Sequence, residues 1–176
     1  MSLFDITLIS FGHFDEKCIE QISKTVRQVY GYPVVMEENL PEMNLFYNGE
    51  RRQYDANKIL EYLHENHLNE RFRIIGLFRV DLYIPILTYI FGQAYFKGRA
   101  GVASIYRLRN EQYGMPKDDD LLLQRFIKVI IHELGHTFGL VHCHNPGCVM
   151  RTSTYVEDID QKSTYLCNHC KPQLKL

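Results

Sequence analysis

The sequence predicts an α/β (α+β) fold in which a mixed, twisted sheet and one long buried helix precede a small cysteine-rich segment. Strand-like and helix-like stretches alternate between residues 3 and 78, and this order requires crossover connections with some parallel pairing. A long apolar helix pattern then ends near Gly139. Four of the five cysteines lie beyond that glycine, between residues 140 and 176.

The first half of the chain contains the alternating elements. Branched and aromatic residues predict strands, whereas apolar side chains at three- and four-residue spacing predict helices. Asp15 can cap the first helix and Gly31 can end it. The elements expected here are a strand over Leu3–Phe11, a helix between Asp15 and Gly31, a strand over Tyr32–Met36, a loop over Asn39–Arg52, a helix over about Ala56–His67 and a strand over Arg73–Phe78.

The second half begins with two further strands, Gln93–Phe96 and Gly101–Tyr106. Pro85 keeps the segment before them out of a sheet interior, because proline lacks an amide proton. Asp118–Asp120 precede the long helix, and we interpret them as its cap rather than as a metal cluster, since acids there satisfy exposed amides and the macrodipole. The helix is apolar around most of its circumference up to about Gly139, which is typical of a helix buried on nearly all sides.

The C-terminal end of this helix carries residues suited to metal chemistry. His132 and His136 are four residues apart, so both imidazoles lie on one helix face and can bind one zinc ion. Glu133 is adjacent and can accept a proton from a water molecule at such an ion. Gly139 can turn the chain so that His142 returns as a third ligand. Three protein ligands leave one position open, as in a catalytic zinc site.

Four cysteines after this helix form two closely spaced pairs. Cys143 and Cys148 are followed, after eighteen residues, by Cys167 and Cys170, a spacing typical of a tetrahedral four-thiolate zinc site. Two disulfides are the alternative. The first apolar run, Ile6–Phe11, is too short for a secretion signal, which favours reduced thiols and zinc. We therefore expect two zinc ions per chain, one catalytic and one structural.

This combination of residues resembles the archaemetzincins, a family of metzincin-type zinc metalloproteases with a cysteine-rich segment fused to the zinc motif. The resemblance is carried by the histidine motif, the four cysteines and Met150, all within residues 132–170. A weaker likeness extends upstream through Val80–Tyr83, Phe91–Ala94 and Ser104–Leu108.

The resemblance implies a metzincin-like zincin fold and a peptide or protein substrate, hydrolysed by a zinc-activated water with Glu133 as general base. It also implies that Met150 lies in a turn beneath the metal, as packing support and not as a ligand. An edge strand near Gly92, Gln93 and Ala94 is expected to bind the substrate backbone. A plain structural hairpin is an equal alternative for these three residues.

The group that stabilises the oxyanion is not identified by the sequence. Some metzincins carry a tyrosine two residues after the methionine, where it can approach the metal. Here Thr152 occupies that position and the nearest tyrosine is Tyr155. Arg107 and Arg109 can meet a substrate carboxylate, although solvated charges at a strand end are the commoner case.

Composition and charge limit the partners and the compartment. Twenty basic and twenty-one acidic residues give a net charge of −1, which indicates neither a nucleic-acid nor a membrane-surface partner. We expect one catalytic domain, with an upper subdomain over residues 1–139 and a lower subdomain over residues 140–176. The expected location is cytoplasmic; the oligomeric state is not determined, and a monomer is the default.

Two other classes of function remain open. The chain can be a non-catalytic, zinc-stabilised interaction module, or a zinc amidase that acts on a small molecule. Retention of Glu133 beside a complete ligand set argues against the first, because binding alone does not need that acid. An open groove with a strand edge would argue against the second, since extended peptides bind to such edges.

Overall fold

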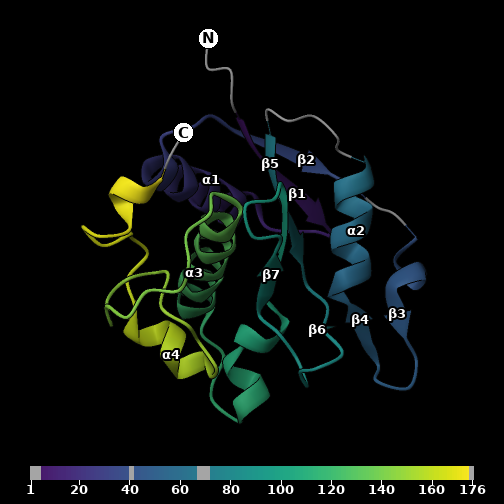
Figure 1. Ribbon diagram of the computed structural model, residues 1–176. Helices are drawn as coiled ribbons and strands as arrows, with labels where there is room; N and C mark the ends of the chain where they lie inside the picture. Colours follow the sequence, from purple (N-terminus) through teal and green to yellow (C-terminus); the bar gives the residue numbers. More distant parts are fainter. Residues whose placement is uncertain (1–4, 40–41, 67–71, 175–176) are drawn as a thin grey trace.

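The computed structural model describes residues 5–39, 42–66 and 72–174 (Figure 1). Leu3 and Phe4 of the expected first strand and His67 of the expected second helix lie outside the described residues. The strands of the main sheet are β1 (Asp5–Phe11), β2 (Val34–Glu38), β5 (Phe72–Phe78), β7 (Gly92–Ala94) and β8 (Ala100–Ser104).

The main sheet is mixed, as expected from the alternation of strands and helices. Its order is β2-β1-β5-β8-β7. The first four strands pair in parallel and β7 runs antiparallel to β8, so β7 forms an edge of the sheet. The near-continuous apolar run in β5 fits its central place, because both faces of such a strand are covered.

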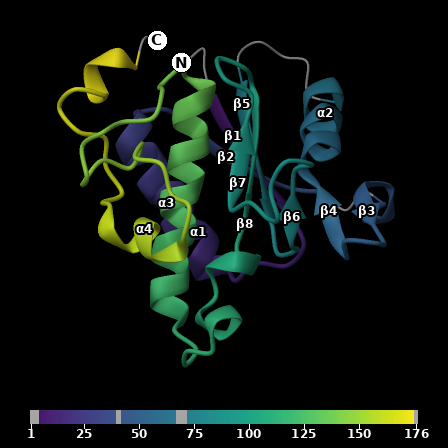
Figure 2. The same cartoon turned by 60° about the horizontal axis from the view of Figure 1, so that its bottom comes forward.

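Helices cover both faces of this sheet. The helices are α1 (Glu16–Tyr30), α2 (Ala56–Asn66), α3 (Asp119–Thr137) and α4 (Val156–Gln161). Figure 2 shows α1 and α3 on one side of the sheet and α2 on the other. Alternate residues of β1 serve the two sides: Ile6 and Leu8 join the core cluster under α1 and α3, whereas Ile9 and Phe11 join the cluster under α2.

The expected caps are confirmed. Asp15 accepts a hydrogen bond from the Lys17 amide, and Gly31 ends α1 in a left-handed conformation with φ of 76°. Asp118 accepts from the Leu121 amide at 2.9 Å, which satisfies one of the amides left free at the start of α3.

The expected loop over Asn39–Arg52 is only partly correct. It contains a 3₁₀ turn, Met43–Phe46, and the short strand β3 (Tyr47–Asn48). β3 forms a small second sheet with β4 (Gln53–Asp55) and β6 (Leu82–Tyr83). Strands of two or three residues leave no periodic pattern, so the sequence did not reveal this sheet. Further 3₁₀ turns lie at Tyr106–Leu108, Asn110–Tyr113 and Lys171–Gln173.

The short helix α4 was not expected, and polar side chains of α3 hold it. Arg125 forms a bidentate ion pair with Asp160, with N–O distances of 2.7 and 2.6 Å. Lys128 Nζ donates to the Ile159 carbonyl oxygen at 3.0 Å. Both cations are buried, so α3 is not apolar all round. Their contacts occupy the C-terminal end of α4, where positive charge is favourable.

The segment after α3 shares the larger core cluster with α1, α3 and the sheet. Val149, Met150, Val156 and Ile159 are buried in that cluster. The last part of the chain is therefore packed onto the rest and has no separate core among the described residues. None of the described helices is both long and apolar enough to cross a membrane.

Candidate metal centres and active-site cleft

The three histidines of the motif converge at the end of α3. One ring nitrogen from each of His132, His136 and His142 lies within 4.8 Å of the others. The Nε2 atoms of the first two are 3.1 Å apart. Two nitrogen ligands about 2.0–2.1 Å from one tetrahedral ion stand about 3.4 Å apart. The observed separation fits a shared zinc ion.

The other ring nitrogens of the helical histidines are bound to the backbone. His132 Nδ1 lies 2.8 Å from the Val149 carbonyl oxygen, and His136 Nδ1 lies 2.8 Å from that of Leu140. Each Nδ1–H can donate to its carbonyl, which fixes the tautomer and leaves Nε2 free for a metal.

Electrostatics keep these imidazoles neutral. Burial lowers the pKa of His132, His136 and His142, and the nearby Lys162 ammonium lowers the pKa of each further. The neutral imidazole is the form that binds a metal ion. The site is therefore prepared for a cation without first losing protons.

Gly139 makes the turn that returns His142. Its φ is 88°, a left-handed conformation that side chains disfavour. A Cβ there would also lie 3.1 Å from Lys97 Cγ. The Gly139 and Lys97 amides both donate to the His136 carbonyl oxygen at 2.9 Å, which ends the helix directly behind the second histidine.

Met150 packs directly against the helix between the two histidines. It is fully buried, and a Cβ at Gly135 would come within 2.9 Å of its Cε. Gly135 thus provides the space that Met150 fills. The sequence reasoning missed this role. The available signal was a glycine inside a helix, which costs about 1 kcal/mol relative to alanine and so needs a packing reason.

The four C-terminal cysteines form a second cluster. Their four Sγ atoms all lie within 4.8 Å of one another; the residues are Cys143, Cys148, Cys167 and Cys170. Cys143 Sγ and Cys167 Sγ are 3.8 Å apart, which is much longer than the S–S bond of a disulfide, about 2.05 Å. The distance agrees with the spacing of about 3.8 Å expected for two thiolates that each lie about 2.3 Å from one tetrahedral zinc ion. All five cysteines are free thiols, and Cys18 lies apart in α1.

The two clusters are joined by consecutive residues and by one turn. His142 belongs to the histidine cluster and Cys143 to the cysteine cluster. The Cys143 amide donates to the Met150 carbonyl oxygen at 3.0 Å, while the preceding carbonyl, of Val149, contacts His132. Each cluster therefore contacts the Met150 turn.

A cleft of about 590 Å³ contains the histidine cluster. Glu133 and the three histidines line it on one side, and Gly92, Gln93 and Ala94 of β7 line another wall. The edge strand expected from the sequence therefore borders the cleft. Residues 152–155 line it from the chain segment that follows the Met150 turn.

Gly92 makes room for Glu133. A Cβ at Gly92 would lie 2.7 Å from the Val102 carbonyl oxygen of β8, 2.8 Å from Glu133 Cγ and 2.9 Å from its Oε1, distances that real Cβ atoms do not adopt. Burial raises the pKa of Glu133 to about 8, and the Lys162 ammonium opposes that rise. Burial at this site therefore favours the neutral, protonated carboxyl group over the carboxylate when no metal ion is bound.

We expect Gly92→Ala to displace the Glu133 carboxylate and lower kcat about 10- to 100-fold, since a misplacement of about 1 Å can have that effect. Peptide-cleavage kinetics would measure it. Gly49→Ala is the matched control, because nothing lies within 4 Å of a Cβ at Gly49. Wild-type kcat in Gly92→Ala would show that Glu133 does not depend on this space.

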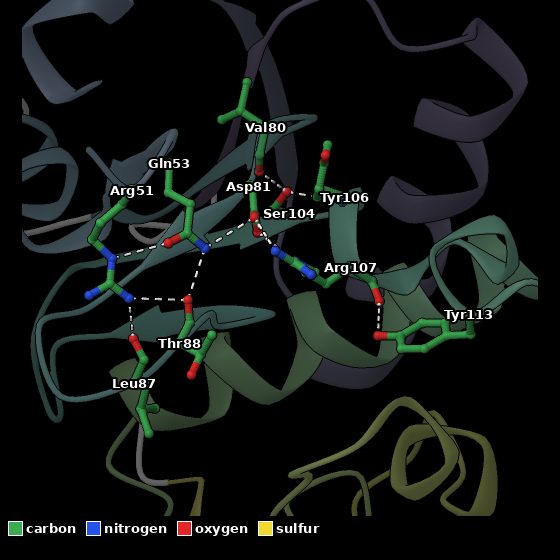
Figure 3. Close-up of polar contacts among 10 residues, drawn as sticks. All are labelled: Arg51, Gln53, Val80, Asp81, Leu87, Thr88, Ser104, Tyr106, Arg107 and Tyr113. Carbon is green, nitrogen blue, oxygen red and sulfur yellow. Dashed lines mark hydrogen bonds and ion pairs between the residues drawn. The ribbon is translucent and has the colours of Figure 1, made fainter. Parts of the chain in front are cut away.

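A polar network holds the rim of the cleft beside the small sheet (Figure 3). Arg107 donates to both carboxylate oxygens of Asp81, at 2.8 and 2.5 Å. Gln53 Nε2 bridges Asp81 and the Thr88 carbonyl oxygen at 3.0 and 2.9 Å, and Arg51 donates to the same Thr88 oxygen at 3.2 Å. The expectation of a solvated or substrate-facing Arg107 is wrong, because its charge is satisfied by a buried carboxylate.

An α/β scaffold with a buried helix, a convergent histidine cluster and an adjacent cysteine cluster defines the class of zinc metallopeptidases. Comparisons with known proteins agree. The sequence profile described as "Peptidase family M54" matches residues 7–176. The archaemetzincin of Thermococcus kodakarensis is 38% identical over 178 residues, which cover 96% of this chain and 94% of the relative.

Solved structures show the same likeness. A zinc-dependent peptidase from Methanocorpusculum labreanum matches with a TM-score of 0.86 and 31% identity, over 97% of this chain and 100% of that one. An archaemetzincin from Methanopyrus kandleri matches with a TM-score of 0.82 and 33% identity, over 97% and 93%. The chain belongs to Peptidase family M54, the archaemetzincins. The resemblance and the metzincin-like fold expected from the sequence are confirmed.

Proposed function

We propose that this peptidase hydrolyses peptide bonds with Glu133 as general base, in a site where His132, His136 and His142 hold a catalytic zinc. The observation that carries the proposal is that the carboxylate, the three imidazoles and a sheet edge line one cleft. A binding module needs no buried carboxylate beside its metal ligands, and a small-molecule amidase needs no strand edge.

The residues of the chain divide the chemistry between them. The three imidazoles bind the metal through one ring nitrogen each, and the Met150 turn supports them. Zinc, when bound, polarises the scissile carbonyl and lowers the pKa of water at the site. Glu133 accepts a proton from the attacking water and delivers it to the leaving amine.

The substrate is proposed to lie along β7. β7 ends the order of the main sheet, so the backbone groups on its outer side can pair with an extended peptide. Gly92, Gln93 and Ala94 all line the cleft. Gln93 also donates to Asn57 Oδ1 of α2 at 3.1 Å, which holds the edge strand against the helix behind it.

We further propose a second, structural zinc held by Cys143, Cys148, Cys167 and Cys170. The Asn145 amide donates to Cys143 Sγ and the Cys167 amide to Cys148 Sγ, both at 3.4 Å, and such donors stabilise thiolates. The upper subdomain would then comprise residues 1–139, with Gly139 at the boundary, and the lower subdomain residues 140–176. Free thiols fit a reducing, cytoplasmic location.

The test combines metal analysis with unbiased cleavage. Gently purified protein is expected to contain about two zinc ions per chain, one for each ligand set, and to cleave a peptide library. Removal of the more accessible zinc by a chelator should stop cleavage, and added zinc should restore it. Full zinc content without any cleavage would favour the interaction module. One zinc ion with the four thiols present as disulfides would reject the structural site.

A further inference from the structure

Lys162 is a buried cation at the cleft that the sequence did not single out. It directly follows α4, which lies against α3 (Figure 2). Its side chain is 4% exposed, and it lines the same cleft as Glu133 and the three histidines. Within the described part of the chain, Nζ makes one hydrogen bond, to the Arg151 carbonyl oxygen at 2.8 Å. An ammonium has three donors, so capacity remains for another acceptor.

The charge of Lys162 acts on the whole site. Burial lowers its pKa to about 8, and Glu133 is the nearby charge that most opposes this shift. Lys162 lines the same cleft as Glu133 and the three histidines, so its charge lies beside the whole cluster. A buried ammonium beside a metal-binding site is unfavourable unless negative charge appears there. Lys162 therefore places a buried positive charge at the cleft in which the substrate is proposed to lie.

The position of Lys162 is fixed by contacts to the helix that carries Glu133. Two residues near the end of the preceding helix, Ile159 and Asp160, are held by Lys128 and Arg125 of α3. The ammonium therefore does not need to reorganise when charge develops nearby. Fixed donors of this kind are the most effective stabilisers of a transition state.

We propose that Lys162 is a catalytic residue that donates a hydrogen bond to the oxygen of the scissile carbonyl as negative charge develops on it. The inference rests on the proposed function. Water adds to the carbonyl carbon, the π-electron pair moves to oxygen, and Glu133 accepts the proton of the water. When the C–N bond breaks, the oxygen returns its electron pair and the amine takes the proton from Glu133. Lys162 stays protonated throughout.

A structural role is the alternative, because the bond to Arg151 also supports the turn after Met150. Three variants separate the two roles. Lys162→Met removes the charge, Lys162→Gln removes the charge but keeps an amide donor, and Lys162→Arg keeps the charge. Lys24→Met, on the exposed side of α1, is the control for loss of one positive charge.

Four quantities are measured for each variant: kcat and KM on a peptide blocked at both ends, the Kd of a phosphinic peptide that carries a tetrahedral anion, zinc content and melting temperature. The two neutral variants are expected to lower kcat about 10²–10³-fold. They should weaken phosphinic binding by a similar factor, with KM and zinc content nearly unchanged. Lys162→Arg should retain most of the phosphinic affinity.

Wild-type kcat and phosphinic affinity in the neutral variants would overturn the proposal. The proposal would also be overturned if zinc content and melting temperature fell together with activity in both neutral variants. That result would mean that Lys162 acts by supporting the turn after Met150. An effect confined to peptides with a free terminal carboxylate would make it a carboxylate-binding residue instead. If the wild-type protein cleaves no peptide, the proposed function fails, and phosphinic affinity alone still decides whether Lys162 binds a tetrahedral anion.

Discussion

Glu133→Gln is expected to lower kcat about 10²–10⁴-fold while zinc content and melting temperature stay close to wild type. The reason is that the amide keeps the shape of the side chain but cannot accept the proton of the attacking water. Glu133 is buried at the cleft, and it does not belong to the histidine cluster that can hold the ion. Steady-state kinetics on a confirmed substrate, with metal analysis of the same sample, would measure both effects.

Glu20→Gln is the matched control for this variant, since Glu20 lies exposed on α1. Its activity should equal that of the wild type. If Glu133→Gln retained full activity with full zinc content, another group would have to be the base and the mechanism proposed above would be wrong.

Cys167→Ser is expected to lower the melting temperature more than His136→Ala, although His136 lies nearer the proposed chemistry. Structural zinc can contribute apparent binding energies of about 10–16 kcal/mol in small peptides. Even a modest fraction of this energy would exceed the contribution of the His136 side chain to the stability of α3, which is already packed in the core. Because Cys143 adjoins His142, Cys167→Ser should also weaken binding of the catalytic zinc. His136→Ala should leave the thiolate site filled.

Thermal unfolding and metal content of both variants test this expectation. Cys18→Ser is the control, because Cys18 lies outside the thiolate cluster and should retain both zinc ions. Equal melting temperatures, with only one zinc lost in each variant, would show that the two sites are independent. Burial of Val149, Met150 and Ile159 in the shared core limits the damage but does not replace the ligands.

The histidine and cysteine clusters could be predicted because their geometry depends on local spacing. His132 and His136 share a helix face by sequence separation alone, and Gly139 returns His142 through a short turn. The parallel strands followed similarly from apolar runs separated by helices. In each case the signal is a short pattern, a spacing of three to five residues or an apolar run, that can be recognised without knowing the tertiary contacts.

The missed features depend on contacts between distant segments. The residues around Lys162 in the sequence do not distinguish it from a surface lysine. Its burial follows from the position of α4, and the six residues of this helix include only two buried apolar side chains, Val156 and Ile159, too few to form a recognisable pattern. Arg125 is a charged residue in a mostly apolar helix, and its partner, Asp160, is 35 residues further along the chain. The sequence placed Gly92 in an edge strand that would bind the substrate backbone. The structure shows in addition that its lack of a side chain leaves space for Glu133.

The direct adjacency of His142 and Cys143 limits how the length of this chain can change. His142 belongs to one cluster and Cys143 to the other, so one residue inserted between them would displace one of the two ligands and leave its cluster incomplete. Insertions and deletions should therefore be absent between the third histidine and the first cysteine.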